Sequence, residues 1–458
     1  MKQLKCMLRQ ILPLLVLILA IFLVAGCGGL SKGTSTVHGS SGSVSASGNA
    51  VAHFVVQWPH TRTHYRPAVI PTGTNRFIIY VSGANVSEFG TVAYIVDKPV
   101  SDTSTTVNIV VPSGSKRLFS VQARQVGLTK FTSPSIVALS DPALSDGTLL
   151  ASGNDAVAHD IVPGQTFTAT VTLAQSGIPD PTTTVVATTI NQVLSTYFPT
   201  VVAIQVIRDQ SGNPITNMNA GNFDVTENGI PCVITDVRTV QQASSNLATT
   251  LVLDRSDSMA GGKNAALEAA ASQFVSLLQP ADLGEIINFS DQVEVTQPFT
   301  SDQGLLTNAI QGQFSRFAAG TALFDGIHQG ITDSAKQGGR EAVIVLTDGQ
   351  NNLGQYNSQD DILAAKQNNI PIFTIGLGAD ADAQVLGDIA ARTGGIYTAA
   401  PSASDLATIY QNISHQLNGQ IQLSYISPDP TKSGTARHVV VNIHYGSLTA
   451  QSTYDYIL

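Results

Sequence analysis

The sequence has few cysteines, with only three in 458 residues. Cys6 lies inside an N-terminal signal-like segment and Cys27 follows that segment directly, which leaves Cys232 alone in the rest of the chain. No disulfide is therefore expected to stabilise the remaining domains, which need hydrophobic cores instead. Cys232 lies between Pro231 and Val233 in a strand-like run. A buried, small apolar role is more common for such a cysteine than a reactive thiol.

Charge is also scarce, since charged residues make up 12% of the chain and the formal net charge is -9. No basic stripe is present, which argues against a nucleic acid partner. Apolar residues account for 43%, and this composition favours packed β structure over long surface helices. The length is sufficient for two to four domains.

The N-terminal segment has the pattern of an export signal. Three basic residues lie within the first nine, and an apolar run follows at residues 11–24. That run is short for a membrane span. Residues 24–27, Val-Ala-Gly-Cys, resemble a bacterial lipobox. The resemblance implies that residues 1–26 are removed and that Cys27 carries lipid, so that the protein is a membrane-anchored lipoprotein of the bacterial cell envelope.

Residues 27–50 are rich in glycine and serine and nearly uncharged, which is typical of a flexible tether. Gly28 stands where an aspartate usually retains a lipoprotein at the inner membrane of bacteria with two membranes. Glycine in the place of that aspartate favours the outer membrane.

Most of the remaining chain outside its centre is expected to be β structure. Short strand-like runs separated by turns predict a β-sandwich module at residues 51–175. A Pro/Thr-rich linker is expected at 176–198. A β segment at 199–244 and a C-terminal β segment at 421–458 follow, and we expect these two to pair into one sandwich interrupted by the middle of the chain.

Residues 245–420 change period, because strand-like runs now alternate with helical ones. The predicted strands are 249–253, 285–289, 342–346, 371–377 and 396–399, and the predicted helices are 263–279, 305–314, 323–337, one from 358, 384–392 and 405–417. Ser358 and Asp361 have the spacing of a capping box for the fourth helix. This order predicts a doubly wound, Rossmann-like α/β domain, so the whole chain is a multidomain protein with flanking all-β, sandwich-like modules. Ligands of such folds bind at the carboxyl ends of the strands.

Polar side chains gather at these strand ends. The sequence LVLDRSDSM places one carboxylate and two hydroxyls at alternate positions after a buried strand, AAGTALFDG adds a hydroxyl before a helix, and VIVLTDGQNN adds a second carboxylate after another strand. The candidate metal ligands are Asp254, Ser256, Ser258, Thr321 and Asp348. These hard oxygen donors suit Mg²⁺, and also Mn²⁺ or Ca²⁺, and they disfavour soft metals.

An alternative is that the first group only caps a helix, because serine and aspartate are ordinary N-cap residues. Three groups at separate strand ends favour the metal site over capping. Asp257 and Asp325 are interpreted as caps or as groups that support the site.

The order Asp-x-Ser-x-Ser, then Gly-Thr, then Thr-Asp-Gly resembles the metal-ion-dependent adhesion site (MIDAS) of von Willebrand factor type A (VWA) domains. The resemblance implies a divalent cation, held by the five residues directly or through water. It also implies that the ion binds a protein or matrix ligand, commonly through a ligand carboxylate.

Two functions follow as hypotheses. The first is a lipid-anchored envelope protein that captures a protein or matrix ligand through the ion. The second is a structural or assembly scaffold of the envelope in which the ion only stabilises the fold. An enzyme is not expected, because the sequence shows no convincing pair of base and nucleophile. The sequence leaves open the ligand, the membrane, the oligomeric state and the role of residues 51–175.

Overall fold

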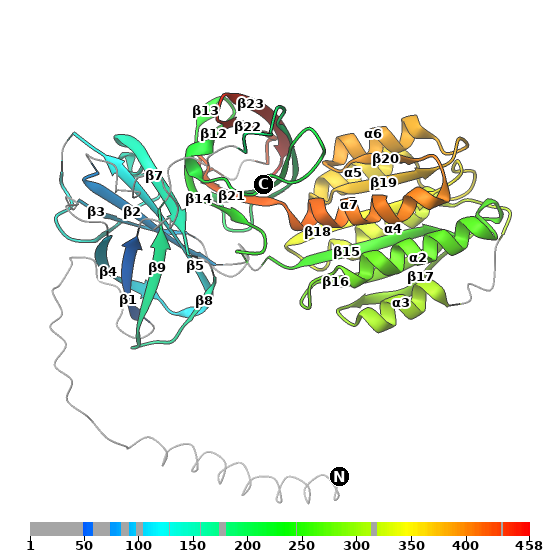
Figure 1. Cartoon of the computed structure of the whole chain (residues 1–458), viewed down its shortest axis with the longest axis horizontal. Coiled ribbons are helices and arrows are strands. Elements are labelled where there is room, and N and C mark those ends of the chain that lie inside the picture. The colour runs from blue at the N-terminus through cyan, green and yellow to red at the C-terminus, as the bar shows by residue number, and fades with distance from the viewer. Residues whose placement is uncertain are drawn as a thin grey trace, which may run out of the picture. The chain divides into compact units, whose positions relative to one another are not determined.

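The computed structural model describes most of the chain beyond residue 48 (Figure 1). The described ranges are 49–57, 74–83, 91–97, 104–127, 129–155, 157–173, 180–243, 245–312, 318–431 and 434–458. The predicted signal peptide 1–26, Cys27 and nearly all of the tether 27–50 lie outside them. Among the described residues, no helix is long and apolar enough to cross a membrane.

The first β module consists of two sheets that share one core. One sheet has the order β4-β1-β9, and the other has the order β6-β3-β2-β5-β7 with β8 paired to β5. The strands are β1 (Asn49–Gln57), β2 (Arg76–Gly83), β3 (Val92–Val96), β4 (Ser104–Pro112), β5 (Gly114–Gln125), β6 (Ser135–Val137), β7 (Thr148–Asn154), β8 (His159–Ile161) and β9 (Thr166–Thr172). Apolar side chains of both sheets pack together, including Phe77, Ile79 and Val121 from one and Ala52 and Ile109 from the other. This is the packing of a β-sandwich.

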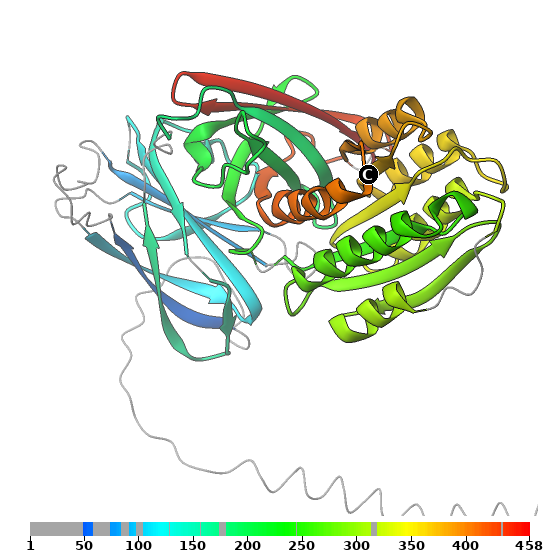
Figure 2. The ribbon, with the colours of Figure 1, turned by 45° about the vertical axis from the view of Figure 1, so that its right-hand side comes forward.

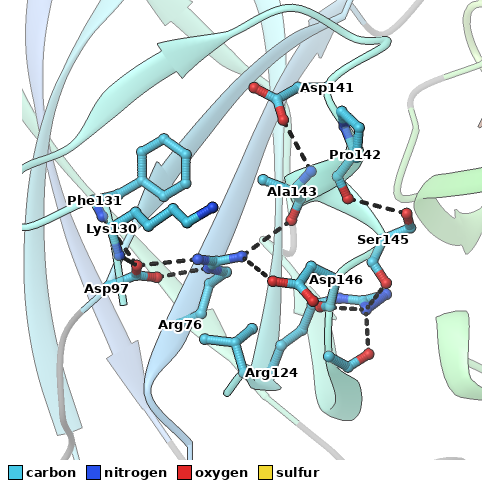
Figure 3. Close-up of polar contacts among 12 residues, drawn as sticks. Arg76, Asp97, Arg124, Lys130, Phe131, Asp141, Pro142, Ala143, Ser145 and Asp146 are labelled. Carbon is cyan, nitrogen blue, oxygen red and sulfur yellow. Dashed lines mark hydrogen bonds and ion pairs between the residues drawn. The ribbon is translucent and has the colours of Figure 1, made fainter. Parts of the chain in front are cut away.

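A buried ion pair ties a long loop to this module (Figure 3). The Arg76 guanidinium donates to both carboxylate oxygens of Asp97, at 2.6 and 3.0 Å. Asp97 also accepts hydrogen bonds from the backbone N–H groups of Lys130 and Phe131. Arg76 further reaches Asp146 at 3.3 Å. Most hydrogen-bond acceptor positions of Asp97 are therefore occupied, and Arg76 balances its negative charge inside the module.

The second β module is assembled from segments on both sides of the central domain. Its sheets have the orders β10-β11-β21-β14 and β13-β12-β22-β23. The strands are β10 (Ala187–Leu194), β11 (Thr200–Arg208), β12 (Phe223–Glu227), β13 (Ile230–Pro231), β14 (Val233–Thr239), β21 (Ile421–Ile426), β22 (Arg437–Tyr445) and β23 (Leu448–Tyr456). β21 therefore lies between two strands that precede the central domain in sequence. Cys232 is free and packs against this module's core, and burial raises the pKa of its thiol to about 12.

The central domain is a six-stranded sheet with the order β17-β16-β15-β18-β19-β20. Its strands are β15 (Leu247–Asp254), β16 (Leu283–Phe289), β17 (Val293–Thr300), β18 (Arg340–Thr347), β19 (Ile372–Leu377) and β20 (Tyr397–Ala400), and its helices are α2 (Gly262–Ser276), α3 (Gln303–Gln311), α4 (Leu323–Ser334), α5 (Ser358–Asn368), α6 (Ala383–Thr393) and α7 (Leu406–Asn418). One core joins the sheet to α2, α3 and α7, and another joins it to α4, α5 and α6. Figure 2 shows α2 and α7 side by side on one face. The predicted doubly wound α/β fold is confirmed.

Three local features differ from the sequence expectation. β10 lies within the range predicted as a linker. Two of its four buried residues, Asn191 and Gln192, are polar and hide the strand pattern. These amides find partners across the fold, at Gly394 O (2.7 Å) and at the Glu341 carboxylate (2.6 Å). β17 was not expected, since it is a half-buried antiparallel edge strand that contains a proline. The capping box of α5 uses Asn357 and Asp360, one residue earlier than predicted.

Candidate metal site

The candidate site lies where the two central parallel strands end. β15 ends at Asp254 and β18 ends at Thr347, and Leu253 pairs with Leu346 in the register between them. Asp348 therefore follows the neighbouring strand at the same sheet edge as Asp254. Both strands are buried along their whole length, which fixes these two carboxylates in the centre of the domain.

Asp254 is fully buried and holds the start of the loop after β15. One carboxylate oxygen accepts from the Ser256 backbone N–H at 2.8 Å, and the other accepts from Thr347 Oγ1 at 2.5 Å. Burial raises the pKa of Asp254 above its ordinary value, the bonds from Ser256 and Thr347 oppose the shift, and the negative charge of Asp348 adds to it. No positive side chain forms a hydrogen bond or ion pair with Asp254 among the described residues, although the charge of the neighbouring Arg255 acts on it.

A chain of short contacts joins the two serines to the second carboxylate. Ser256 Oγ lies 3.0 Å from Ser258 Oγ, and Ser258 Oγ donates to Asp348 Oδ1 at 2.6 Å. Ser256 and Asp348 are buried, whereas Ser258 is exposed. Two of these three residues are thus buried in the domain, and Ser258 leaves the site open to solvent on one side.

Thr321 approaches the same place from the loop before α4. It is buried, and its backbone N–H donates to the side chain of Asn352 at 2.8 Å. Its Oγ1 would lie 3.9 Å from a Cβ placed on Gly349, directly after Asp348. The structure thus brings together all five residues singled out from the sequence.

The donor set consists of two carboxylates and three hydroxyls. Among the described residues, no group of three or more His, Cys, Asp or Glu side chains is arranged to hold a metal ion. All five candidate ligands offer oxygen atoms, the donor type that hard cations prefer.

Sequence reasoning missed Arg255, which follows Asp254. A charged residue after a strand is usually exposed, yet Arg255 is fully buried. It donates to Asn288 Oδ1 at 2.9 Å, to Glu268 Oε1 at 2.9 Å and to Ile310 O at 2.8 Å. These partners belong to β16, α2 and α3, so Arg255 fixes the loop that carries both serines. No sequence signal marked this role.

Lys263 was also missed. Its ammonium lies 2.5 Å from Asp348 Oδ2. A signal was present, because a lysine in the first turn of a helix is electrostatically unfavourable and calls for a partner.

The two aspartates read as supporting groups have different environments. Asp257 is exposed and begins a 3₁₀ turn, Asp257–Met259. Asp325 accepts from the backbone N–H groups of Gln355 and Tyr356, at 2.9 and 3.1 Å. It thereby fixes the loop that follows Asp348. His328 stacks on Tyr356, in the same loop, with ring centroids 3.6 Å apart.

The central domain matches a family model. The model of the von Willebrand factor type A domain aligns with residues 250–412. These residues form a VWA domain. The match includes Asp254, Ser256, Ser258, Thr321 and Asp348 within its range.

Two curated relatives match part of the chain. Inter-alpha-trypsin inhibitor heavy chain H4 of Bos taurus is 26% identical over 199 residues, which are 38% of this chain and 21% of that protein. Heavy chain H6 of Homo sapiens is 26% identical over 196 residues, 38% of this chain and 15% of that protein. The chain therefore spans about a fifth or less of the length of these relatives.

Solved structures with similar folds include other VWA proteins. A von Willebrand factor type A protein from Catenulispora acidiphila has a TM-score of 0.37 and 12% identity, covering 62% of this chain and 74% of that one. Proximal thread matrix protein 1 from the mussel byssus, in a structure with a zinc-occupied MIDAS motif, has a TM-score of 0.36 and 18% identity, covering 39% of this chain and 47% of that one. A VWA domain suggests a role in adhesion or protein–protein interaction.

Proposed function

We propose that this protein binds a divalent cation through Asp254, Ser256, Ser258, Thr321 and Asp348 and uses the ion to capture a protein or matrix ligand. The observation that supports the proposal best is the convergence of three chain segments. The loops after β15 and β18 and the loop before α4 bring oxygen donors to one sheet edge. Helix capping alone would not require that convergence.

The residues present fit a hard divalent ion. Two carboxylates balance a charge of +2, and the hydroxyls are neutral oxygen donors. In the structure the carboxylates make bonds mainly to hydroxyl and backbone donors, and the only positive side chain that contacts them among the described residues is Lys263. Mg²⁺ is the ion we expect, because it typically takes one or two protein carboxylates and keeps several waters. Mn²⁺ or Ca²⁺ are the alternatives.

The exposure of Ser258 supports ligand capture over a purely structural ion. An ion held at this surface can bind an oxygen anion from outside, such as a partner's Asp or Glu side chain. The protein is exported to the bacterial cell envelope and anchored by lipid on Cys27, and Gly28 in the place of aspartate favours the outer membrane. The β modules then present the VWA domain to its partner. We propose a binding role and not catalysis.

Calorimetric titration of Mg²⁺ into the full chain tests the first step, with Asp254→Ala as the inactive variant and Asp388→Ala, which changes an exposed aspartate on α6, as the control. We expect heat of binding in the wild type and in the control only. Equal binding by the Asp254→Ala variant would overturn the site assignment.

An array of short acidic peptides tests the second step. We expect some peptides to bind in Mg²⁺, to dissociate in chelator, and to lose binding when their Asp or Glu is changed to Asn or Gln. An ion that stabilises the fold without promoting capture of any acidic peptide would favour the scaffold function instead.

A further inference from the structure

Lys263 is placed directly on one of the proposed ion ligands. Its Nζ lies 2.5 Å from Asp348 Oδ2, while Asp348 Oδ1 accepts from Ser258 at 2.6 Å. The Asp348 side chain is 0% exposed and the Lys263 side chain is 41% exposed. Both oxygens of this carboxylate are therefore engaged by the protein's own groups, and one of these groups is a cation.

The helix itself does not account for this lysine. Lys263 lies in the first turn of α2, where the aligned peptide dipoles repel positive charge. That turn contains no acidic residue, and the N-cap, Gly261, has no side chain to offer. Asp348, more than eighty residues away in sequence, is the carboxylate that Lys263 reaches. The contact with Asp348, a proposed ion ligand, is therefore the interaction that favours a lysine at position 263.

The charges favour exchange between Lys263 and a divalent ion. Asp254, Asp348 and Lys263 together carry a net charge of -1 when all three are ionised. A divalent ion added with Lys263 still in place leaves a net positive charge, and the two cations repel each other at short range. Without the ammonium, two carboxylates and a divalent ion are neutral.

Lys263 is also able to leave. Its four-carbon stem is flexible and partly in solvent. The preceding Gly261 and Gly262 have open space around the positions that a Cβ would occupy. The ammonium can therefore move into water without displacing core side chains.

From these observations we infer that Lys263 is an internal counter-cation of the site. It neutralises Asp348 in the ion-free protein and has to leave that carboxylate when a divalent ion binds, so it lowers the affinity for the ion. This inference rests on the proposed function and deepens it, since it assigns Lys263 as a residue that lowers the affinity of the site for its ion.

The test compares Lys263→Met, which keeps most of the apolar stem and removes the charge, with Lys263→Arg, which keeps the charge. Mg²⁺ is titrated calorimetrically into each full-length protein. We expect Lys263→Met to bind at least about fivefold more tightly than the wild type, which corresponds to a partly exposed ion pair that no longer competes. Lys263→Arg is expected to bind with an affinity equal to or below that of the wild type.

Thermal unfolding provides the second readout. In chelator, Lys263→Met should melt below the wild type because Asp348 then lacks its counter-charge, and saturating Mg²⁺ should remove or reverse the difference. Unchanged or weaker Mg²⁺ affinity in Lys263→Met would overturn the inference while leaving the proposed function standing. An absence of Mg²⁺ binding in the wild type would instead overturn both.

Discussion

Two buried carboxylate groups in this protein are balanced by positive charge to very different degrees. In the first β module, Asp97 accepts two bonds from Arg76 and two from backbone N–H groups (Figure 3). Burial raises the pKa of Asp97, but these bonds outweigh it and hold the pKa below its usual value. In the VWA domain, Asp348 pairs with one partly exposed lysine, Asp254 forms no ion pair among the described residues, and burial raises the pKa of Asp254.

The difference separates a structural ion pair from a site that favours an added cation. The Arg76–Asp97 pair is complete, so it has no need of a ligand. The pair Asp254 and Asp348 has twice the negative charge and depends on hydroxyl donors, which are neutral. Burial alone therefore does not indicate a cation site, and we expect one where two buried carboxylates lie close together without matching positive charge.

The largest effect is expected from breaking the complete pair. Arg76→Met leaves the Asp97 carboxylate buried without its partner, which costs about 3–5 kcal/mol in unfolding free energy. Denaturant unfolding measures the loss, which Mg²⁺ should not restore. The double variant Arg76→Met/Asp97→Leu should recover much of the stability. A single variant as stable as the wild type would show that the pair contributes little.

The second largest effect is expected from removing one carboxylate of the candidate metal site. Asp254→Ala should weaken Mg²⁺ binding by at least about 100-fold, the upper end of what is lost when a group that only orients a ligand is removed. The wild type should gain about 2.7 kcal/mol of stability at an ion concentration of 100 times its Kd, and the variant should gain at most about 0.4 kcal/mol. Unfolding curves with Mg²⁺ and with chelator measure both. An equal gain in stability from Mg²⁺ in Asp254→Ala would show that Asp254 is not part of a cation site and would remove the contrast with Asp97.

The five candidate ligands were predictable because each follows or precedes a strongly patterned element. Asp254 and Asp348 stand directly after apolar strands, and parallel strands end at one sheet edge. Arg255 and Lys263 were not predicted, since their roles depend on residues distant in sequence, such as Ile310 and Asp348. The α/β order of the VWA domain was predicted for the same reason as its ligands.

The β modules were harder to predict. β10 carries buried amides in place of apolar residues, and these amides are satisfied by Gly394 and Glu341, far along the chain.

The metal assignment itself stays a prediction.

A smaller effect is expected from the hydroxyl donors. Ser258→Ala removes one neutral donor and the bond to Asp348 but no charge, so Mg²⁺ affinity should fall by about tenfold. Calorimetry measures the change, and Ser276→Ala, an exposed serine at the end of α2, is the control. A loss as large as that of Asp254→Ala would show that charge is not the main determinant of the site.

The smallest effect concerns a buried carboxyl that is neutral at neutral pH. Burial raises the pKa of Asp361 to about 9, and the charges of Asp360 and Asp325 add to the shift. Burial also lowers the pKa of His328, whose Nδ1 lies 3.1 Å from Asp361, so the two form a neutral hydrogen-bonded pair.

Asp361→Asn should therefore cost at most about 1 kcal/mol, the net value of one hydrogen bond. The folded pKa of Asp361 lies above the unfolded value of about 3.9, so its protonated form stabilises the fold at low pH and this contribution is lost as the pH rises through about 9. Asparagine does not titrate, so the cost of the substitution should shrink and turn into a gain between about pH 5 and pH 8, where ionisation of Asp361 in the unfolded state destabilises only the wild type. Denaturant unfolding at both pH values measures it. A cost that grows with pH would mean that Asp361 is ionised and balanced like Asp97, and the contrast between the two regions would then be confined to Asp254 and Asp348.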